Sequence, residues 1–232
     1  MIYNKDSCDM TEIKDNSIAL IVTSPPYPMI SKWDNMFGML NFDKQHKHLD
    51  STWEECNRIL IPGGIICINI GDATRSIDKH FCCYPNYARV TMKIFQIGLT
   101  PLVPIIWKKI SNRPNAFLGS GFLPPNAYIS QDCEMIGIYR KGRIRQFTTK
   151  NEIRKSSEYT KTERDLWFQQ IWNIQGARGA KKHSNFPEEI PYRLIRMFSI
   201  LNDLVVDPFM GSGTTQRVAE NLSRKFIGYE KY

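Results

Sequence analysis

The chain lacks the features of membrane, disulfide-bonded and metal-binding proteins. None of its apolar runs approaches the roughly 20 residues that a membrane-spanning helix needs. Its first residues are polar, so no secretory signal is expected there. Its six cysteines show no CxxC spacing and its four histidines form no zinc pattern, so we expect reduced thiols and no metal site. These absences favour a cytoplasmic protein without a membrane partner.

The composition is that of an ordinary globular protein. The chain has 232 residues, of which 42% are hydrophobic and 23% are charged. This length is enough for one domain with a substantial core, so we expect a single domain over residues 1–232.

Positive charge is concentrated in one part of the chain. The formal net charge is +8, and residues 139–182 hold 12 Lys and Arg against 4 Asp and Glu, which accounts for the whole surplus. Aromatic side chains interleave with these bases: Phe147, Tyr159, Trp167, Phe168 and Trp172. This pattern is typical of a nucleic-acid partner, the alternative being a solvated basic face without a partner.

Apolar runs alternate with amphipathic stretches over most of the chain. Strands are predicted at 18–23, 65–70, 102–107, 134–139, 204–207 and 226–230, and helices at 50–60, 87–97, 187–201 and 214–223. Ser184 or Asn185 is expected to cap the third helix, with Pro187 in its first turn. The alternation predicts an α/β fold with a doubly wound, mostly parallel sheet. Residues from about 109 to 172 break the rhythm and are expected to form an inserted basic region.

A glycine-rich turn near the C-terminus joins a predicted strand to a predicted helix. Asp207 ends the strand, Gly211 and Gly213 form the turn, and Thr214 begins the helix. Such turns lie at the carboxyl ends of strands, where ligands bind. No lysine follows the glycines and the third glycine of the dinucleotide fingerprint is missing, so a nucleoside without a pyrophosphate, such as S-adenosylmethionine, fits best. Glu230 ends the next strand, where an acid can accept hydrogen bonds from ribose hydroxyls.

A second turn, Ser24–Tyr27, follows the first predicted buried strand. The exocyclic amino group of a base is a poor nucleophile because its lone pair is delocalised, and it needs acceptors for its hydrogens. The Ser24 hydroxyl and the Pro25 carbonyl supply two acceptors, and both prolines hold the turn rigid. Tyr27 offers a flat face on which a flipped-out base can stack. An ordinary proline turn is the alternative, which the position after a buried strand disfavours.

Together these residues resemble the amino-group DNA methyltransferases of restriction–modification systems. Thr23–Tyr27 is similar to the family's catalytic motif and Asp207–Thr215 to its cofactor motif, and their order matches the permuted β group. The resemblance implies a Rossmann-like, S-adenosylmethionine-dependent methyltransferase fold that acts on double-stranded DNA in a prokaryotic cytoplasm. A carbon-5 cytosine methyltransferase would need a Pro-Cys nucleophile, which the chain lacks.

The resemblance also implies roles for individual residues. The implied catalytic residues are Ser24, Pro25, Pro26 and Tyr27. The implied cofactor-binding residues are Asp6, Phe186, Pro187, Asp207, Pro208, Phe209, Gly211, Ser212, Gly213, Thr214 and Glu230. Serine at the first catalytic position is typical of enzymes that make N4-methylcytosine, and aspartate of those that make N6-methyladenine, so we expect cytosine N4.

In this permuted order the family's target-recognition region usually lies between the two motifs, which matches the basic region at about 109–172. Its Lys and Arg are expected to contact phosphates, and its Arg, Asn and Gln to read base edges. The chain is short for this task, so a homodimer or a short target site is compatible with it, and a cognate restriction endonuclease is a compatible partner. Trp33, Phe37 and Phe42 are expected either to cover the flipped base or to pack a loop.

Two other functions stay open from the sequence. Methyltransferases that act on RNA bases or protein amides also carry a Pro-Pro-Tyr turn, but normally after the glycine motif, so the order found here disfavours them. An inactive DNA-binding subunit with the same fold is disfavoured because both motifs are intact.

Overall fold

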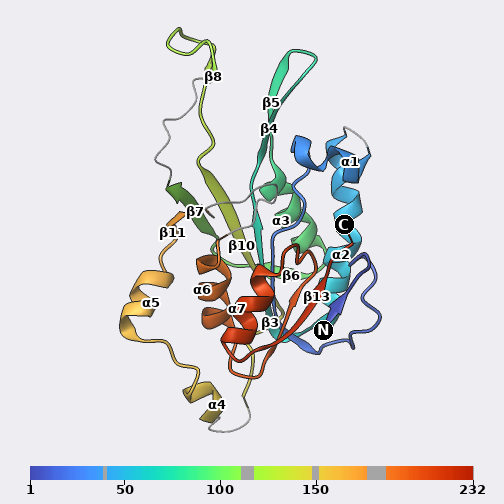
Figure 1. Ribbon diagram of the computed structural model, residues 1–232, viewed down its shortest axis with the longest axis vertical. Helices are drawn as coiled ribbons and strands as arrows, with labels where there is room; N and C mark the ends of the chain where they lie inside the picture. The colour runs from blue at the N-terminus through green and yellow to red at the C-terminus, as the bar shows by residue number, and fades with distance from the viewer. Residues whose placement is uncertain (39–40, 111–117, 148–151, 177–186, 232) are drawn as a thin grey trace.

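A nine-stranded mixed sheet forms the centre of the part of the chain that the structure describes (Figure 1). The computed structural model describes residues 1–38, 41–110, 118–147, 152–176 and 187–231. The strands pair in the order β1-β13-β12-β2-β3-β10-β7-β11, with β6 beside β10. Their bounds are β1 Ile2–Tyr3, β2 Ile18–Thr23, β3 Leu60–Ile70, β6 Leu99–Pro101, β7 Ile105–Ile110, β10 Cys133–Lys141, β11 Ile171–Gln175, β12 Leu204–Asp207 and β13 Lys225–Tyr229.

Most neighbouring strands are parallel. Strands β1, β13, β12, β2 and β3 form a parallel series, and β11 is parallel to β7. Strand β10 runs against β3, β6 and β7. The predicted doubly wound, mostly parallel α/β fold is therefore confirmed, with β10 as a reversed strand inside it.

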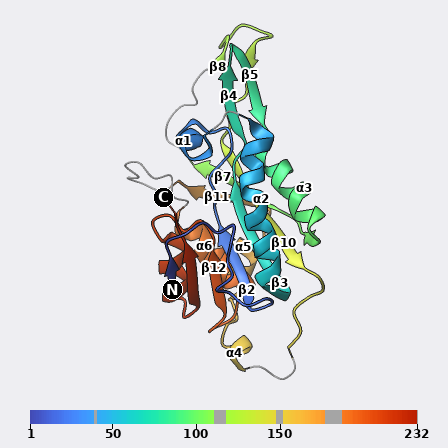
Figure 2. The same cartoon turned by 90° about the vertical axis from the view of Figure 1, so that its right-hand side faces the viewer.

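Helices cover both faces of the sheet, as Figure 2 shows. Their bounds are η1 Ser31–Trp33, α1 Asp34–Phe37, α2 Phe42–Ile59, α3 Asn86–Gln96, α4 Glu152–Lys155, α5 Lys161–Trp167, α6 Glu189–Phe198 and α7 Thr214–Asn221. Helices α2 and α3 pack on one face in a core cluster around Trp53, and α5, α6 and α7 pack on the other in a cluster around Leu194. Successive residues of β2 alternate between the clusters, because Ile21 belongs to the first and Leu20 and Val22 to the second.

Two hairpins extend beyond the sheet at the carboxyl ends of the parallel strands (Figure 1). One is formed by β4 (Ala73–Ile77) and β5 (His80–Tyr84), and the other by β8 (Leu118–Gly119) and β9 (Ala127–Tyr128). The rings of Phe81 and Tyr128 stack with centroids 4.1 Å apart. The two hairpins therefore support each other next to the edge where the candidate site lies.

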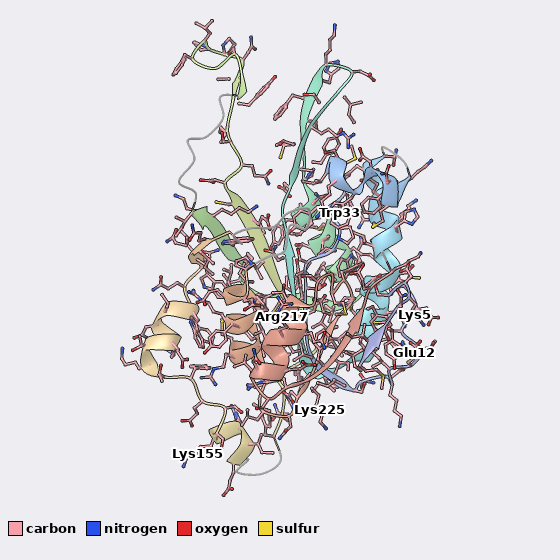
Figure 3. All side chains as sticks on the ribbon, viewed as in Figure 1. Lys5, Glu12, Trp33, Lys155, Arg217 and Lys225 are labelled. Carbon is pink, nitrogen blue, oxygen red and sulfur yellow. The ribbon has the colours of Figure 1, made fainter. Side chains whose placement is uncertain are left out.

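The basic region of the sequence is only partly separate from the sheet. It contains β10, and it overlaps with β7 and β11 at its ends. Because β10 runs against β3, its last residues point away from the hairpins: Met135 pairs with Ile70 at the end of β3, and Arg140 pairs with Ile65 in its middle. Helix α4 lies at the edge opposite to the hairpins, and Figure 3 labels Lys155 there. The described basic residues between Arg140 and Lys155 thus lie away from the carboxyl ends of the parallel strands.

Several element boundaries differ from those predicted: helix α2 begins at Phe42 rather than at residue 50, and the strand expected at 102–107 is found as β7 at Ile105–Ile110. Helix α2 ends at Ile59, close to its predicted end, but strand β3 begins directly at Leu60 rather than at the predicted residue 65. Gly63 has φ 82°, and a Cβ there would lie 2.3 Å from the backbone nitrogen of Arg145, so glycine allows the close approach of that segment. Helix α6 begins at Glu189, so Pro187 precedes the helix and Glu188 is its N-cap. The expected cap residues, 184 and 185, lie outside the described residues.

Other sequence expectations concern membrane spans, disulfides and metals. No helix among the described residues combines the length and apolar character that crossing a bilayer requires. All six cysteines are free thiols. In the same described ranges, His, Cys, Asp and Glu side chains form no group of three or more that could hold a metal ion.

Candidate active site

The two turns singled out in the sequence lie side by side. Strands β12 and β2 are parallel neighbours, with Val206 paired to Ile21. At their carboxyl ends the Thr23 hydroxyl donates a hydrogen bond of 2.6 Å to Asp207 Oδ1 across 184 residues of sequence. The Ser24–Tyr27 turn therefore starts directly beside the glycine-rich turn.

Asp207 joins these turns with a buried carboxylate. The side chain is 1% exposed, and it accepts hydrogen bonds from the Thr23 hydroxyl at 2.6 Å, the Thr215 hydroxyl at 2.6 Å and the Phe209 amide at 3.0 Å. Burial raises the pKa of Asp207 to about 6, against hydrogen bonds from Thr215 and Thr23 that lower it. Both oxygens are thus occupied by donors of the chain itself, and Asp207 holds strand β2 and helix α7 together.

The glycine-rich turn offers an open backbone surface. Gly211 and Gly213 have φ angles of 49° and 79°, which favour glycine. A Cβ at Gly211 would meet no heavy atom within 4 Å, so a ligand has room to approach the turn there. Gly211 and Ser212 are exposed, while Gly213 and Thr214 are buried at the start of α7. The Gly211 amide donates a hydrogen bond of 2.6 Å to Glu230 Oε2, which places this carboxylate beside the turn.

Two acids stand at the ends of neighbouring strands near this turn. The amide of Glu230 donates to the carbonyl of Tyr3 at 3.1 Å, because β13 and β1 are parallel neighbours. Asp6 follows β1, accepts from the Cys8 amide at 3.0 Å, and pairs with Lys231 at 3.0 Å. Carboxylates at the ends of strands fit the hydroxyl and amino groups of a nucleoside, so this edge fits S-adenosylmethionine. Lys5, which follows β1, forms an ion pair of 2.7 Å with Glu12; both are labelled on the right in Figure 3.

The other residues expected to bind cofactor differ in their placement. Pro208 is buried, and Phe209 is half-buried with its ring 5.9 Å from that of Trp53, edge to face. Pro187 is half-buried and its carbonyl accepts from the Ile190 amide at 3.0 Å, next to the start of α6. Phe186 lies outside the described residues.

In the Ser24–Tyr27 turn the two prolines are covered by protein, while the side chains of Ser24 and Tyr27 are partly accessible to solvent. Pro25 and Pro26 are buried, whereas Ser24 and Tyr27 are half-buried. The Ser24 and Tyr27 hydroxyl oxygens are 3.1 Å apart. Burial and then the neighbouring Glu134 carboxylate raise the pKa of Tyr27 well above its usual range, so the phenol keeps its proton at neutral pH.

Two residues next to this turn were not found by sequence reasoning. Asn69, at the end of β3 and 2% exposed, donates a hydrogen bond of 2.7 Å to the Tyr27 hydroxyl. The Tyr27 hydroxyl donates at 2.8 Å to Glu134, near the start of β10. Asn69 could have been suspected, because it ends the strand after the catalytic turn. Glu134 carries no such signal, since only the reversed direction of β10 brings it to the carboxyl edge.

Aromatic residues outside the two turns divide between core and surface. Phe37 is 3% exposed and belongs to the core, so it packs the loop after the catalytic turn. Trp33 is half-buried, with the Lys32 ammonium 4.5 Å from its ring centroid (labelled in Figure 3). In the basic region, Trp167 and Trp172 are 4% and 1% exposed. These two indoles fill the second core cluster, so they are interleaved with the bases in sequence but do not lie beside them on the surface.

Comparison with known proteins decides the family. The family model for the N6 and N4 methyltransferases, described as DNA methylase, matches residues 18–232. The chain belongs to this family. The type II methyltransferase M.MjaI of Methanocaldococcus jannaschii is 49% identical to it over 97% of this chain and 84% of the relative. The type II methyltransferase M.MthZI of Methanothermobacter thermautotrophicus is 44% identical over 99% of this chain and 72% of the relative.

Solved structures of similar proteins agree that this chain is an amino-group DNA methyltransferase. The protein TTHA0409 of Thermus thermophilus, solved in complex with S-adenosyl-L-methionine, has a TM-score of 0.82 and 30% identity and covers 100% of this chain and 89% of its own. The PvuII DNA methyltransferase (cytosine-N4-specific) has a TM-score of 0.72 at 24% identity, covering 100% of this chain and 81% of its own, which shows the common fold. The methyltransferase thus uses S-adenosylmethionine and acts on DNA, as the sequence resemblance implied.

Proposed function

We propose that this methyltransferase modifies the exocyclic N4 amino group of cytosine in double-stranded DNA. The observation that carries the proposal is the position of Ser24. Its hydroxyl stands at the carboxyl end of β2, on the strand joined to the glycine-rich turn by the Thr23–Asp207 hydrogen bond of 2.6 Å. Serine at this place is the residue typical of N4-methylcytosine enzymes among the proteins that the sequence resembles.

In this proposal the chain's own residues activate and orient the amine. S-Adenosylmethionine, when bound, supplies a methyl group on a sulfonium that an amine can accept. The Ser24 hydroxyl oxygen and the Pro25 carbonyl accept the two hydrogens of the amino group, so that its lone pair turns out of the base plane. Tyr27 stacks on the extruded base. Positioning and exclusion of water supply the acceleration, and the surplus proton leaves afterwards to Ser24 or to water.

The cofactor residues belong to the same proposal. Glu230 and Asp6 bind the polar groups of the nucleoside, while the backbone of Gly211–Thr214 and the ring of Phe209 line the site. Support comes from the open space at Gly211 and from the Glu230 carboxylate beside the turn. Phe186 and Pro187 are proposed to border the methionine end.

Substitution of Ser24 by alanine tests the catalytic assignment. We expect Ser24→Ala to lower kcat by roughly a hundredfold or more while S-adenosylmethionine binding, measured by calorimetry, stays that of the parent. Ser17→Ala is a matched control, because Ser17 is an exposed serine just before the opposite end of β2. Full activity of Ser24→Ala would remove Ser24 from the mechanism.

Adenine N6 is the second candidate target. The family includes enzymes of both kinds, and the same two acceptors would suit the adenine amino group. Nucleoside mass spectrometry of DNA from cells that express the protein separates the two products. RNA and protein substrates, tested with tritiated S-adenosylmethionine in parallel, would address the remaining alternatives.

Recognition of DNA is proposed to use the part of the 109–172 region that lies at the carboxyl edge, rather than all of it. Residues after Arg140 leave the sheet toward the opposite edge, whereas β7 ends at the carboxyl edge and the β8–β9 hairpin extends beyond it (Figure 1). A homodimer and a cognate endonuclease are proposed as partners on the strength of the small chain and its relatives. Sedimentation of the protein with and without a DNA duplex tests the first.

A further inference from the structure

A closed set of hydrogen bonds lies beneath the catalytic turn. It links the Lys109 ammonium to Glu134, Glu134 to the Tyr27 hydroxyl at 2.8 Å, and the Tyr27 hydroxyl to Ser24 at 3.1 Å. Asn69 donates to both the Tyr27 hydroxyl and Glu134 Oε2, each at 2.7 Å. The Glu134 side chain is 12% exposed, so solvent contributes little to this set.

The direction of each bond follows from counting protons. An ionised carboxylate only accepts, and Glu134 is paired with a cation through its other oxygen. The Tyr27 phenol has a single proton, and it points at Glu134 Oε2. The phenol oxygen can then only accept from its remaining neighbours, Asn69 and Ser24.

Asn69 reinforces this direction. Its amide nitrogen lies 2.7 Å from both the Tyr27 hydroxyl and Glu134 Oε2, which are themselves 2.8 Å apart, so one amide hydrogen is shared between these two acceptors. The opposite amide orientation would turn the Asn69 carbonyl toward the Glu134 carboxylate, where two acceptors would repel each other. Glu134 therefore determines the amide orientation as well as the phenol orientation.

The consequence reaches the reacting group. Because the Tyr27 proton is committed to Glu134, the 3.1 Å contact leaves Ser24 as the donor toward Tyr27. The hydroxyl hydrogen of Ser24 then points into the protein, and both of its lone pairs are left for a group above the turn. A hydroxyl fixed in this way presents only acceptor character to an incoming amine.

We infer that Glu134 is a positioning residue, which acts through Tyr27 to fix the Ser24 hydroxyl as an acceptor for an amino hydrogen of the target base. This inference rests on the proposed function, because it needs Ser24 to accept from the amine. It adds a role for a residue on the reversed strand β10 that neither turn contains.

The Glu134→Gln variant tests the inference with little change in shape. Glutamine could present its N–H groups to the Lys109 ammonium, where like donors repel, or to Tyr27 and Asn69, with its carbonyl oxygen left for Lys109; the second orientation is therefore favoured. In the second orientation Tyr27 must donate to Ser24, which releases the Ser24 hydrogen toward the amine. We expect kcat to fall by roughly ten- to a hundredfold, with KM for DNA and cofactor affinity unchanged. Glu54→Gln is the matched control, because Glu54 is 58% exposed on α2 and should leave kcat at the parent value.

A double-mutant cycle shows whether Glu134 acts through the phenol. Tyr27→Phe keeps the aromatic ring and removes the hydroxyl, so Ser24 loses its fixed orientation. Adding Glu134→Gln to Tyr27→Phe should then lower kcat no further. If the fold-loss in kcat of the double variant equals the product of the two single-variant losses, the inference is overturned, because Glu134 would then act by a route other than the phenol.

The remaining outcomes separate this inference from the proposed function. Full activity of Ser24→Ala contradicts the proposed function and the inference together. A strong loss in Ser24→Ala with parent activity in Glu134→Gln overturns the inference alone, and so does a kcat loss in Glu134→Gln accompanied by an equal loss of cofactor affinity. If Glu134→Gln does not fold, Lys109→Met, at a side chain 41% exposed, is compared with Lys225→Met, at an exposed lysine that begins β13 away from the site. A lower kcat for Lys109→Met alone supports the inference, and equal values overturn it.

Discussion

Replacing Thr23 with valine isolates the joint between the two turns. Valine has nearly the shape of threonine, so the change removes the hydroxyl that donates to Asp207 Oδ1 at 2.6 Å and keeps the packing. Both residues are 1% exposed, so water is kept away from the vacated position. The perturbation therefore concerns one buried, charge-assisted hydrogen bond.

The expected loss follows from the partners that Asp207 keeps. Hydrogen bonds to charged groups contribute about 1.5–3 kcal/mol. Because Phe209 still donates to the same oxygen and Thr215 to the other, we expect the free energy of unfolding to fall by about 2 kcal/mol at neutral pH. In a protein of this size that corresponds to a decrease in Tm of about 4–8 °C.

The loss should also depend on pH. The pKa of Asp207 is raised to about 6 by burial, and the Thr23 hydrogen bond lowers it, so Thr23→Val raises this pKa further. The folded variant then binds its proton more readily than the parent. The difference in stability between parent and variant is expected to be largest at about pH 8 and to shrink toward about pH 5.

Urea unfolding followed by tryptophan fluorescence at several pH values measures these differences. Thr52→Val is the matched control, because Thr52 is also 1% exposed but pairs with the neutral Ser7 hydroxyl at 3.3 Å. That variant should lose about 1 kcal/mol or less, with no pH dependence. A Thr23→Val variant that stays within about 0.5 kcal/mol of the parent, or loses the same amount at every pH, would refute the reasoning.

Three further predictions concern residues near the carboxyl ends of the parallel strands. Asp207 has a folded-state pKa of about 6 against a usual 3.8, so its share of stability is complete below about pH 4 and is lost as the pH rises to about 6, by up to about 3 kcal/mol; Asp207→Asn should lack this slope in urea unfolding. Glu230→Ala should raise the Kd for S-adenosylmethionine in calorimetry, and an unchanged Kd would remove Glu230 from the site. Lys108→Ala should reduce the salt dependence of DNA binding by about one in slope, whereas Arg143→Ala, beyond the opposite edge, should leave it unchanged; equal slopes would argue against recognition at the carboxyl edge.

Local patterns were sufficient where an element is defined by its own residues. Strand β2 at Ile18–Thr23 and strand β12 at Leu204–Asp207 have the predicted bounds, because a continuous apolar run ends at a turn in each. Helix α7 begins at Thr214 as predicted, since Gly213 in a left-handed conformation starts it. The meeting of the two turns followed from the rule that carboxyl ends of parallel strands share one edge.

Patterns were insufficient where the outcome depends on distant partners. Trp167 and Trp172 stand among basic residues in the sequence, yet burial in the second core cluster removes them from any binding face. Glu134 is 107 residues from Tyr27, and only the antiparallel insertion of β10 beside β3 brings them to 2.8 Å. Gly63 follows the end of helix α2, but the local pattern gave no sign that it also admits the backbone of Arg145 beside β3.

The most direct test of the account is the identity of the methylated atom. The purified protein would be incubated with duplex DNA and S-adenosylmethionine that carries an isotopically labelled methyl group, and the DNA would be digested for nucleoside mass spectrometry. The account predicts label in N4-methylcytosine and its near-complete loss with Ser24→Ala. Label in 5-methylcytosine or N6-methyladenine, or label that persists unchanged in Ser24→Ala, would contradict it.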